Sequence, residues 1–257
     1  MLDILSLTIP FFAIILLGIL ARHKQYFSDR DGQMLARFAF FVALPPFMFV
    51  AITATDVTSA FHIGFIMRYE IGTITMFILS ALFVRMFLRL SNPERGLFCL
   101  NTAYPNYGYI CVPLAILAFG EQAAIPVSML LVCDTIILLI MTNILSHSPE
   151  SGRLSQALYS TFISMLKNPL LMSVLVGFAF SAMGFRIEGM PDRFLQMLAG
   201  AAAPTALFAL GITLIGQPIR ATMNEIVPIT ILKLCVHPAI IAALFLGWPS
   251  EVQIDPL

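Results

Sequence analysis

Long runs of apolar residues, separated by short polar connections, dominate the hydrophobic pattern of this chain. A helix needs about 20 mostly apolar residues to cross a bilayer. Stretches of that length cover residues 4–21, 38–55, 63–84, 97–119, 123–145, 162–183, 194–216 and 226–247. The longest connection, HSPESGRLSQALYS at 147–160, is predicted to be a polar linker in mid-chain. The pattern therefore predicts an all-α polytopic membrane protein with about eight spans.

The composition strengthens this prediction. Of the 257 residues 59% are hydrophobic and only 11% are charged, with a mean hydropathy of +0.92, whereas a soluble domain has roughly 25% charged residues. We therefore expect a lipid bilayer around the chain, and the net charge of zero gives no indication of nucleic-acid binding. The cysteines (Cys99, Cys111, Cys133 and Cys235) lie in apolar stretches without CxxC spacing. We interpret them as buried small side chains and expect no metal site and no cofactor.

The basic residues are distributed unevenly between the connections, and Lys and Arg favour cytoplasmic loops. The odd-numbered connections carry Arg22, Lys24, Arg30, Arg37, Arg85, Arg89, Arg95, Arg153, Lys167 and Arg220. The even-numbered connections carry Arg68, Arg186 and Arg193. We therefore expect a multi-pass protein of the inner (plasma) membrane, with its odd connections in the cytoplasm and its N-terminus outside.

Two pairs of stretches align at one constant offset of 159 residues. They are TIPFFAIILLGILA (8–21) with KNPLLMSVLVGFAF (167–180), and LPPFMFVAI (44–52) with APTALFALG (203–211). The offset superimposes Pro10 on Pro169, Gly18 on Gly177, Pro45 on Pro204 and Phe49 on Phe208. Because an odd number of spans precedes the second copy, it enters the bilayer from the opposite side, as in the inverted repeats of secondary transporters. The alternative is a pair of unrelated helices that both carry proline.

The repeat predicts how the chain is organised. A first five-helix transmembrane repeat covers 1–145, a cytoplasmic linker covers 146–161, and an incomplete second repeat of three helices covers 162–257. The offset of 159 carries residues 101–113 to 260–272, which is beyond Leu257. We therefore expect a C-terminally truncated chain that lacks the ninth and tenth spans of a complete protein.

The fourth apolar stretch contains helix-breaking residues in the sequence NTAYPNYGYICVP at 101–113. Proline has no N–H, so Pro105 frees the carbonyl of Asn101 and Pro113 frees that of Tyr109. Lipid cannot satisfy such groups, and broken backbone at this depth must face protein or a water-filled cavity. Pro113 is suited to begin a second half-helix, whose first amides would carry a partial positive charge that suits an anion.

Asn101 and Asn106 add neutral hydrogen-bonding groups to this break, and Gly108 permits close approach of a ligand to the backbone. The substrate-binding residues predicted from this segment are Asn101, Pro105, Asn106, Gly108, Tyr109 and Pro113. The alternative is a simple proline kink in which the asparagines satisfy the freed carbonyls.

The sequence PNYGYICVPLAILAFGE (105–121) resembles the fourth-span signature of the auxin efflux carrier family, which includes plant PIN exporters and bacterial malonate/malate-type permeases. The family pattern is approximately P-N-x-x-x-x-G-I-P-L followed by an F/Y-G turn, and it is matched here by Pro105, Asn106, Pro113, Leu114 and Gly120. Cys111 stands where the family usually has glycine. LPPFMF (44–49), PTALFALGITL (204–214) and KLCVHP (233–238) are similar to patterns of the second, seventh and eighth spans.

The resemblance implies ten spans in two inverted five-span repeats, with broken fourth and ninth spans that cross at the substrate site. Asn106 matches the substrate-contacting asparagine of the family, and Pro105 and Pro113 match crossover positions. The implied substrates are small organic anions such as dicarboxylates or auxins. Family members form homodimers through their scaffold helices.

Ionisable residues inside apolar stretches are candidates for coupling transport to an ion gradient, because a charge at the bilayer centre is costly. Asp134 lies in the middle of its span and could bind a cation or relay a proton, or serve as a hydrogen-bonded packing residue. Lys233 could attract an anion, pair with an acid, or extend its ammonium group to the interface. Arg68 and Glu70 lie near the start of their span and are interpreted as a surface pair or boundary charges.

Together these features predict a permease that moves a small organic anion by alternating access, coupled to a proton or sodium gradient. A truncated, non-transporting protein of the same family is the main alternative. A membrane enzyme using Asp134 or Glu70 is disfavoured, since the sequence shows no acids paired at an active spacing and no GxSxG, HExxH, GxGxxG or Walker motif. We therefore expect no catalytic residues. A membrane sensor is a further alternative, although no signalling domain is attached.

Overall fold

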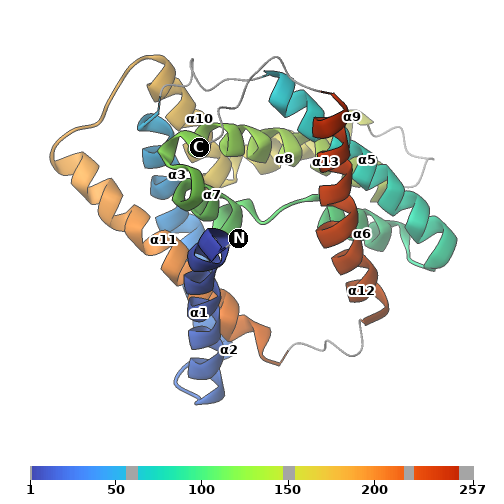
Figure 1. Ribbon diagram of the computed structural model, residues 1–257, viewed down its shortest axis with the longest axis horizontal. Helices are drawn as coiled ribbons and strands as arrows, with labels where there is room; N and C mark the ends of the chain where they lie inside the picture. Colours follow the sequence, from blue (N-terminus) through green and yellow to red (C-terminus); the bar gives the residue numbers. More distant parts are fainter. Residues whose placement is uncertain (1, 56–62, 147–153, 217–222, 249–257) are drawn as a thin grey trace. The chain divides into compact units, whose positions relative to one another are not determined.

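The computed structural model describes residues 2–55, 63–146, 154–216 and 223–248, and these residues form helices without a β-strand. Figure 1 shows the helices. The chain divides into two compact units. Unit 1 comprises Met1–Phe61, Asn106–Met129 and Ser164–Pro218, and unit 2 comprises His62–Pro105, Leu130–Ile163 and Ile219–Leu257. Each unit draws on both predicted repeats, and the repeat boundaries stay a prediction.

The helices of unit 1 are α1 (Leu2–His23), α2 (Asp29–Phe38), η1 (Ala39–Ala43), α3 (Leu44–Thr53), η2 (Tyr107–Cys111), α7 (Val112–Phe119), η3 (Glu121–Ala123), α10 (Pro169–Ala182) and α11 (Met190–Leu214). Those of unit 2 are α5 (Ile63–Phe87), α6 (Asn92–Ala103), α12 (Met223–Ile231), η5 (Leu232–Val236) and α13 (His237–Gly247). Helix α8 (Ala124–Ser146) begins in unit 1 and continues in unit 2, while α9 (Leu154–Leu166) begins in unit 2 and ends in unit 1.

The prediction of an all-α membrane protein is confirmed. Among the described residues, helical stretches long and apolar enough to cross a membrane cover Asp29–Thr53, Ile63–Phe87, Glu121–Ser146, Met190–Leu214 and Met223–Gly247. Shorter apolar helices cover Thr8–His23 and Pro169–Ala182. The number of spans and their orientation stay predictions, and Arg153 and Arg220, on which the orientation partly rests, lie outside the described residues.

Helix α9 begins at Leu154, inside the predicted linker at 146–161, and the boundaries of this linker stay a prediction. The polar residues of this segment are interspersed with enough apolar ones to form a helix, as in LSQALYSTFISML. The predicted sixth span at 162–183 is also interrupted. Asn168 accepts hydrogen bonds from the amides of Leu170 and Leu171 at 3.0 and 3.3 Å, so it caps a new helix that begins with Pro169.

Wide helical turns, in which an amide bonds the carbonyl five residues back, recur directly before prolines. They are η1 before Pro45, η2 before Pro113 and η5 before Pro238. Proline lacks the amide of a normal helical bond, and its ring clashes with the carbonyl four residues back. A wide turn at this point lets the helix continue through the proline, and such turns often mark functional sites.

Glycines allow close helix packing inside unit 1. Helix α1 packs against α11, and a Cβ atom added at Gly18 would overlap the carbonyl oxygen of Phe208. A Cβ added at Gly211 would overlap the carbonyl oxygen of Ile15. Helix α3 packs against both α10 and α11 (Figure 1), and a Cβ at Gly177 would lie 3.2 Å from Cβ of Ile52. Small residues thus bring the helix backbones together, as is usual in membranes.

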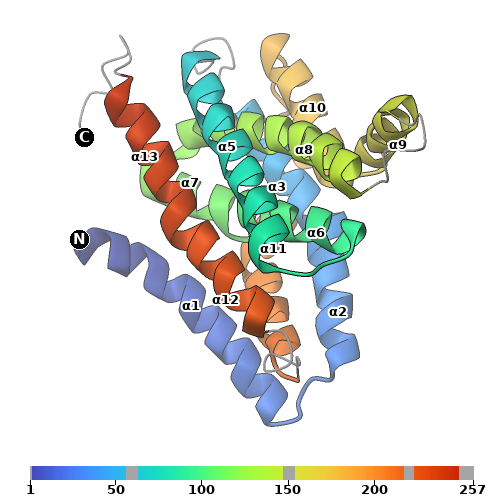
Figure 2. The same cartoon turned by 90° about the vertical axis from the view of Figure 1, so that its right-hand side faces the viewer.

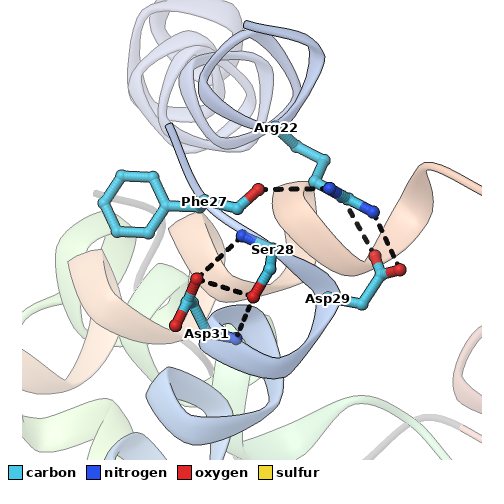
Figure 3. Close-up of polar contacts among 5 residues, drawn as sticks. All are labelled: Arg22, Phe27, Ser28, Asp29 and Asp31. Atoms are coloured by element: carbon cyan, nitrogen blue, oxygen red, sulfur yellow. Dashed lines mark hydrogen bonds and ion pairs between the residues drawn. The ribbon is translucent and has the colours of Figure 1, made fainter. Parts of the chain in front are cut away.

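The connection from α1 to α2 is closed by polar contacts (Figure 3). Ser28 caps α2, because its hydroxyl accepts the amide of Asp31 at 3.2 Å while its own amide donates to the Asp31 carboxylate at 2.8 Å. Arg22 forms two hydrogen bonds with the carboxylate of Asp29, at 3.0 and 2.8 Å. These contacts fix the turn between two helices of unit 1.

In unit 2, α5 packs against α6 and α13, which lie on either side of it in Figure 2. The buried core of unit 2 contains Met76, Phe77, Cys99, Ala103 and Leu138. Cys99 is confirmed as a buried side chain, Cys111 and Cys133 are half-buried, and Cys235 is exposed, contrary to the prediction that all four are buried.

Candidate functional site

The predicted break in the fourth apolar stretch is confirmed. Helix α6 ends at Ala103, Tyr104 has extended dihedral angles (φ −80°, ψ 117°), and helical structure resumes at Tyr107. Pro105 lies in the non-helical segment. The restart differs from the prediction that Pro113 begins the second half-helix, since the wide turn η2 precedes α7 and Pro113 lies at the start of α7.

Asn106 lies at the N-terminal end of this second half-helix. Its carbonyl accepts the amides of Ile110 and Cys111 at 3.3 and 2.9 Å, which closes the first turn of η2. The positive end of the helix dipole is therefore at Asn106 and Tyr107, earlier in the chain than predicted. Asn106 is exposed and Tyr107 is buried.

Gly108 and Pro113 pack inside unit 1. A Cβ added at Gly108 would lie 3.4 Å from Cδ1 of Leu44 and 3.5 Å from Cδ2 of Leu170, which is ordinary contact. Pro113 is buried. The predicted substrate residues are therefore divided, with Asn101 and Pro105 in unit 2 and Asn106, Gly108 and Pro113 in unit 1. The side chain of Tyr109 lies outside the described part of the structure.

Lys233 satisfies backbone carbonyls at the end of α6. Its Nζ donates to the carbonyl oxygen of Asn101 at 2.9 Å and to that of Tyr104 at 2.7 Å. Asn101 is the residue whose carbonyl Pro105 frees from the helical pattern. A cation at the C-terminal end of a helix also interacts favourably with the helix dipole. The lysine thus stabilises one end of the break, a partner that sequence reasoning did not identify.

Glu70 and Asp134 lie together in unit 2. Glu70 is 7% exposed and Asp134 is fully buried, and the two carboxyl groups are close enough to interact directly. The prediction that Glu70 is a surface or boundary charge paired with Arg68 is wrong. The Arg68 guanidinium instead lies over the rings of Phe245 and Trp248, at 5.6 and 6.0 Å from their centroids.

Hydroxyl groups line the same region of unit 2. The hydroxyl of Tyr104 lies 2.9 Å from that of Thr135, the residue next to Asp134. Nε2 of His237, which is also buried, lies 3.4 Å from the hydroxyl of Thr73. An acid within an apolar span was the available sequence signal for Glu70, but its position near the span boundary led to the wrong interpretation.

A cavity of about 420 Å³ lies on α2 and is lined by Arg30, Gln33, Met34 and Arg37. These side chains share one face of the helix, because Gln33 and Met34 each lie three or four residues from both Arg30 and Arg37. None of the predicted substrate residues lines this cavity, so we assign it no part in substrate binding.

The sequence is similar to those of known membrane transport proteins. A model of the family described as "Membrane transport protein" matches residues 3–250. A protein of Rhizobium meliloti (strain 1021), named "Putative malonate transporter", is 31% identical over 253 residues, which cover 96% of this chain and 78% of that protein. A protein of Escherichia coli (strain K12), named "Uncharacterized transporter YfdV", is 22% identical over 253 residues, which cover 97% of this chain and 80% of that protein. The residues matched by the family model include 101–113, where the helix is broken.

Proposed function

The chain belongs to the membrane transport protein family, and on this premise we propose that it carries a small organic anion, a dicarboxylate such as malonate, across the inner membrane. The resemblance to auxin efflux carriers at residues 105–121 is thereby confirmed, and the chain is a membrane transporter. The choice of a dicarboxylate rests on the name of the relative from Rhizobium meliloti (strain 1021).

The observation that carries this proposal is the interrupted backbone between α6 and η2. Polar backbone groups at membrane depth are tolerated where they face protein or a water-filled cavity. The helix that begins at Tyr107 directs its positive end toward the break, and this is a favourable environment for a carboxylate. Asn106 adds a side-chain amide that can donate a hydrogen bond to it.

Alternating access, the mechanism proposed here, is supported by paired contacts inside unit 1. The offset of 159 residues relates Gly18 to Gly177 and Gly211 to Ile52. Gly18 packs against Gly211 between α1 and α11, and Gly177 packs against Ile52 between α10 and α3. Contacts at related positions are expected of a structural repeat, and inverted repeats are common in secondary transporters. The orientation with the N-terminus outside belongs to the same proposal.

Substitution of Asn106 tests the proposed site. In the purified protein, Asn106→Ala should weaken the binding of labelled malonate about tenfold or more, because a hydrogen bond to a charged group is lost. Asn224→Ala is the matched control, since Asn224 is an exposed asparagine of α12. Equal affinity in both variants would remove Asn106 from the site.

Transport is tested separately, in proteoliposomes. Uptake of labelled malonate by the wild-type chain, compared with empty liposomes, distinguishes a working permease from a non-transporting member of the family. If unlabelled malonate reduces the uptake of labelled malonate and a neutral amide of malonate does not, this would support an anion as the substrate. A protein that binds no dicarboxylate and moves none would contradict the proposed substrate class.

A further inference from the structure

Two acidic side chains of unit 2 are buried among membrane-crossing helices. Glu70 lies on α5 and Asp134 on α8, and the helical stretches Ile63–Phe87 and Glu121–Ser146 that contain them are long and apolar enough to cross a membrane. Glu70 is 7% exposed and Asp134 is fully buried. Acids in such positions are costly and are usually functional.

The surroundings of Glu70 provide a second observation. Both of its carboxyl oxygens are buried, and no hydroxyl, amide or cation among the described residues donates a hydrogen bond to either oxygen. The group with which this carboxyl interacts is that of Asp134. A hydrogen bond between two carboxyl groups requires a proton, because ionised carboxylates only accept.

Several charged and titratable groups lie near the acidic pair. On the elements around the pair they are Arg68 and Tyr69 on α5, Cys99 on α6, Tyr104 at its end, Cys133 on α8, Lys233 on η5 and His237 on α13. Lys233 bonds two backbone carbonyls and Arg68 lies over aromatic rings. Within the described residues, Glu70 forms no ion pair with a cation.

Burial of two adjacent carboxylates is strongly unfavourable, both through lost hydration and through mutual repulsion, and the Glu70 oxygens have no donor to offset it. One proton shared between them removes a charge and supplies the missing hydrogen bond. We propose that Glu70 and Asp134 form a proton-binding site, in which a single proton is held between the two carboxyl groups. The ligand of this site is the proton, and its source is water on one side of the membrane.

The pair is connected to the broken helix by residues of unit 2. Asp134 is followed by Thr135, whose hydroxyl lies 2.9 Å from that of Tyr104. Tyr104 is the C-cap residue of α6 and directly precedes Pro105. Loss or gain of the shared proton changes the charge of the pair that includes Asp134, which is adjacent to Thr135 and its contact with Tyr104. If the proposed transport function is correct, the site links anion movement to the proton gradient. A carboxylate oxygen of the pair takes a proton from water on one side of the membrane. The new O–H bond then breaks and returns the proton to water on the other side.

Infrared spectroscopy tests the proton site directly and does not depend on transport. Near neutral pH, the full-length protein should show the carbonyl stretch of a protonated carboxyl group, which shifts in heavy water. The double variant Glu70→Gln/Asp134→Asn should lose this band, because the amides keep the shape of both side chains but cannot bind the proton. Glu188→Gln, at an exposed acid, is the control and should retain it. Absence of the band in the wild-type protein, or its persistence in the double variant, would overturn the proposal.

Transport measurements test the coupling. An inward proton gradient should increase malonate uptake by the wild-type protein several-fold, and the apparent affinity should change about tenfold per pH unit where one linked proton titrates. The double variant should lose this pH dependence and still exchange malonate across the membrane. An unchanged response of the double variant, or stimulation by sodium instead of protons, would overturn the coupling. Wild-type protein that moves no malonate would refute the proposed function, while the infrared result would still decide the proton site.

Discussion

Unit 1 and unit 2 bury different kinds of side chain, although both are built from apolar helices. The buried polar residues of unit 2 are Glu70, Thr73, Ser80, Thr102, Asp134, Thr135, Thr142, Thr161 and His237. In unit 1, Ser128 is the buried polar side chain among the described residues. Unit 1 instead contains the close glycine contacts between α1 and α11. Packing therefore dominates in one unit and polar interactions in the other.

This difference indicates which kinds of amino-acid substitution each unit tolerates. Close helix packing depends on shape, so an added methyl group is costly wherever the backbone of a neighbouring helix blocks it. Buried polar groups depend on their partners, so removal of one partner is costly even when the shape is kept. Polar groups inside apolar helices are also the ones that a transporter needs for its substrate and coupling ion.

The largest expected effect is at the contact between α1 and α11. Gly211→Ala should destabilise the protein by about 3 kcal/mol, because the new Cβ would overlap the Ile15 carbonyl and cannot be accommodated by a side-chain rotation. The thermal midpoint of the purified protein measures the loss. The matched control is Gly200→Ala on the same helix, where a Cβ meets open space and alanine favours the helix by roughly 0.5–1 kcal/mol. Similar behaviour of the two variants would show that unit 1 is not tightly packed at Gly211.

The next largest effect is expected in unit 2. Lys233→Met should cost roughly 2 kcal/mol, since the carbonyl of Asn101 loses its charged donor while the bulk of the side chain is kept. Lys167→Met, at an exposed lysine, should change the thermal midpoint little. Full stability of Lys233→Met would mean that water or another donor replaces the lysine at the end of α6.

A smaller effect is expected at the second glycine contact of unit 1. Gly177→Ala should cost less than about 1 kcal/mol, because its Cβ would meet the Ile52 side chain at 3.2 Å and not backbone. Ile52→Val should partly rescue Gly177→Ala in a double-mutant cycle, because the smaller side chain leaves room. Strict additivity of the two substitutions would indicate that these residues do not share a contact.

The smallest effect concerns the surface of unit 2. The hydroxyl and the backbone amide of Ser91 both donate to the Glu94 carboxylate, at 2.7 Å each. The bond from the hydroxyl, and then that from the amide, holds the pKa of Glu94 below its usual value. A lowered pKa means that stabilisation is present above the ordinary glutamate value of about 4 and is lost as the pH falls through the lower pKa of the folded protein. The thermal midpoint of wild type should exceed that of Glu94→Gln slightly at neutral pH, and the difference should disappear in acid. If the difference between the two thermal midpoints did not depend on pH, the ionised Glu94 carboxylate could not be its cause.

The sequence alone determined the features that depend on local chemistry. Apolar stretches predict membrane helices because a bilayer demands length and hydrophobicity, and Pro105 predicts a break because its own ring prevents the helical bond. The restart at Tyr107 was predicted less well, since a wide turn before Pro113 is one of several ways in which a helix can accommodate proline. The family signature around Asn106 was also recognised from the sequence, because its residues are contiguous in the chain.

Only the tertiary structure decided which distant groups meet. Lys233 reaches a carbonyl that lies 132 residues earlier, and Glu70 faces Asp134 while Arg68, two residues from Glu70, lies over aromatic rings. A side chain on a membrane helix can face lipid, protein or a polar cavity, and its spacing along the chain is compatible with each of these. The packing of one helix against another makes that choice, so the pairing of buried charges follows from the fold and not from any single stretch of sequence.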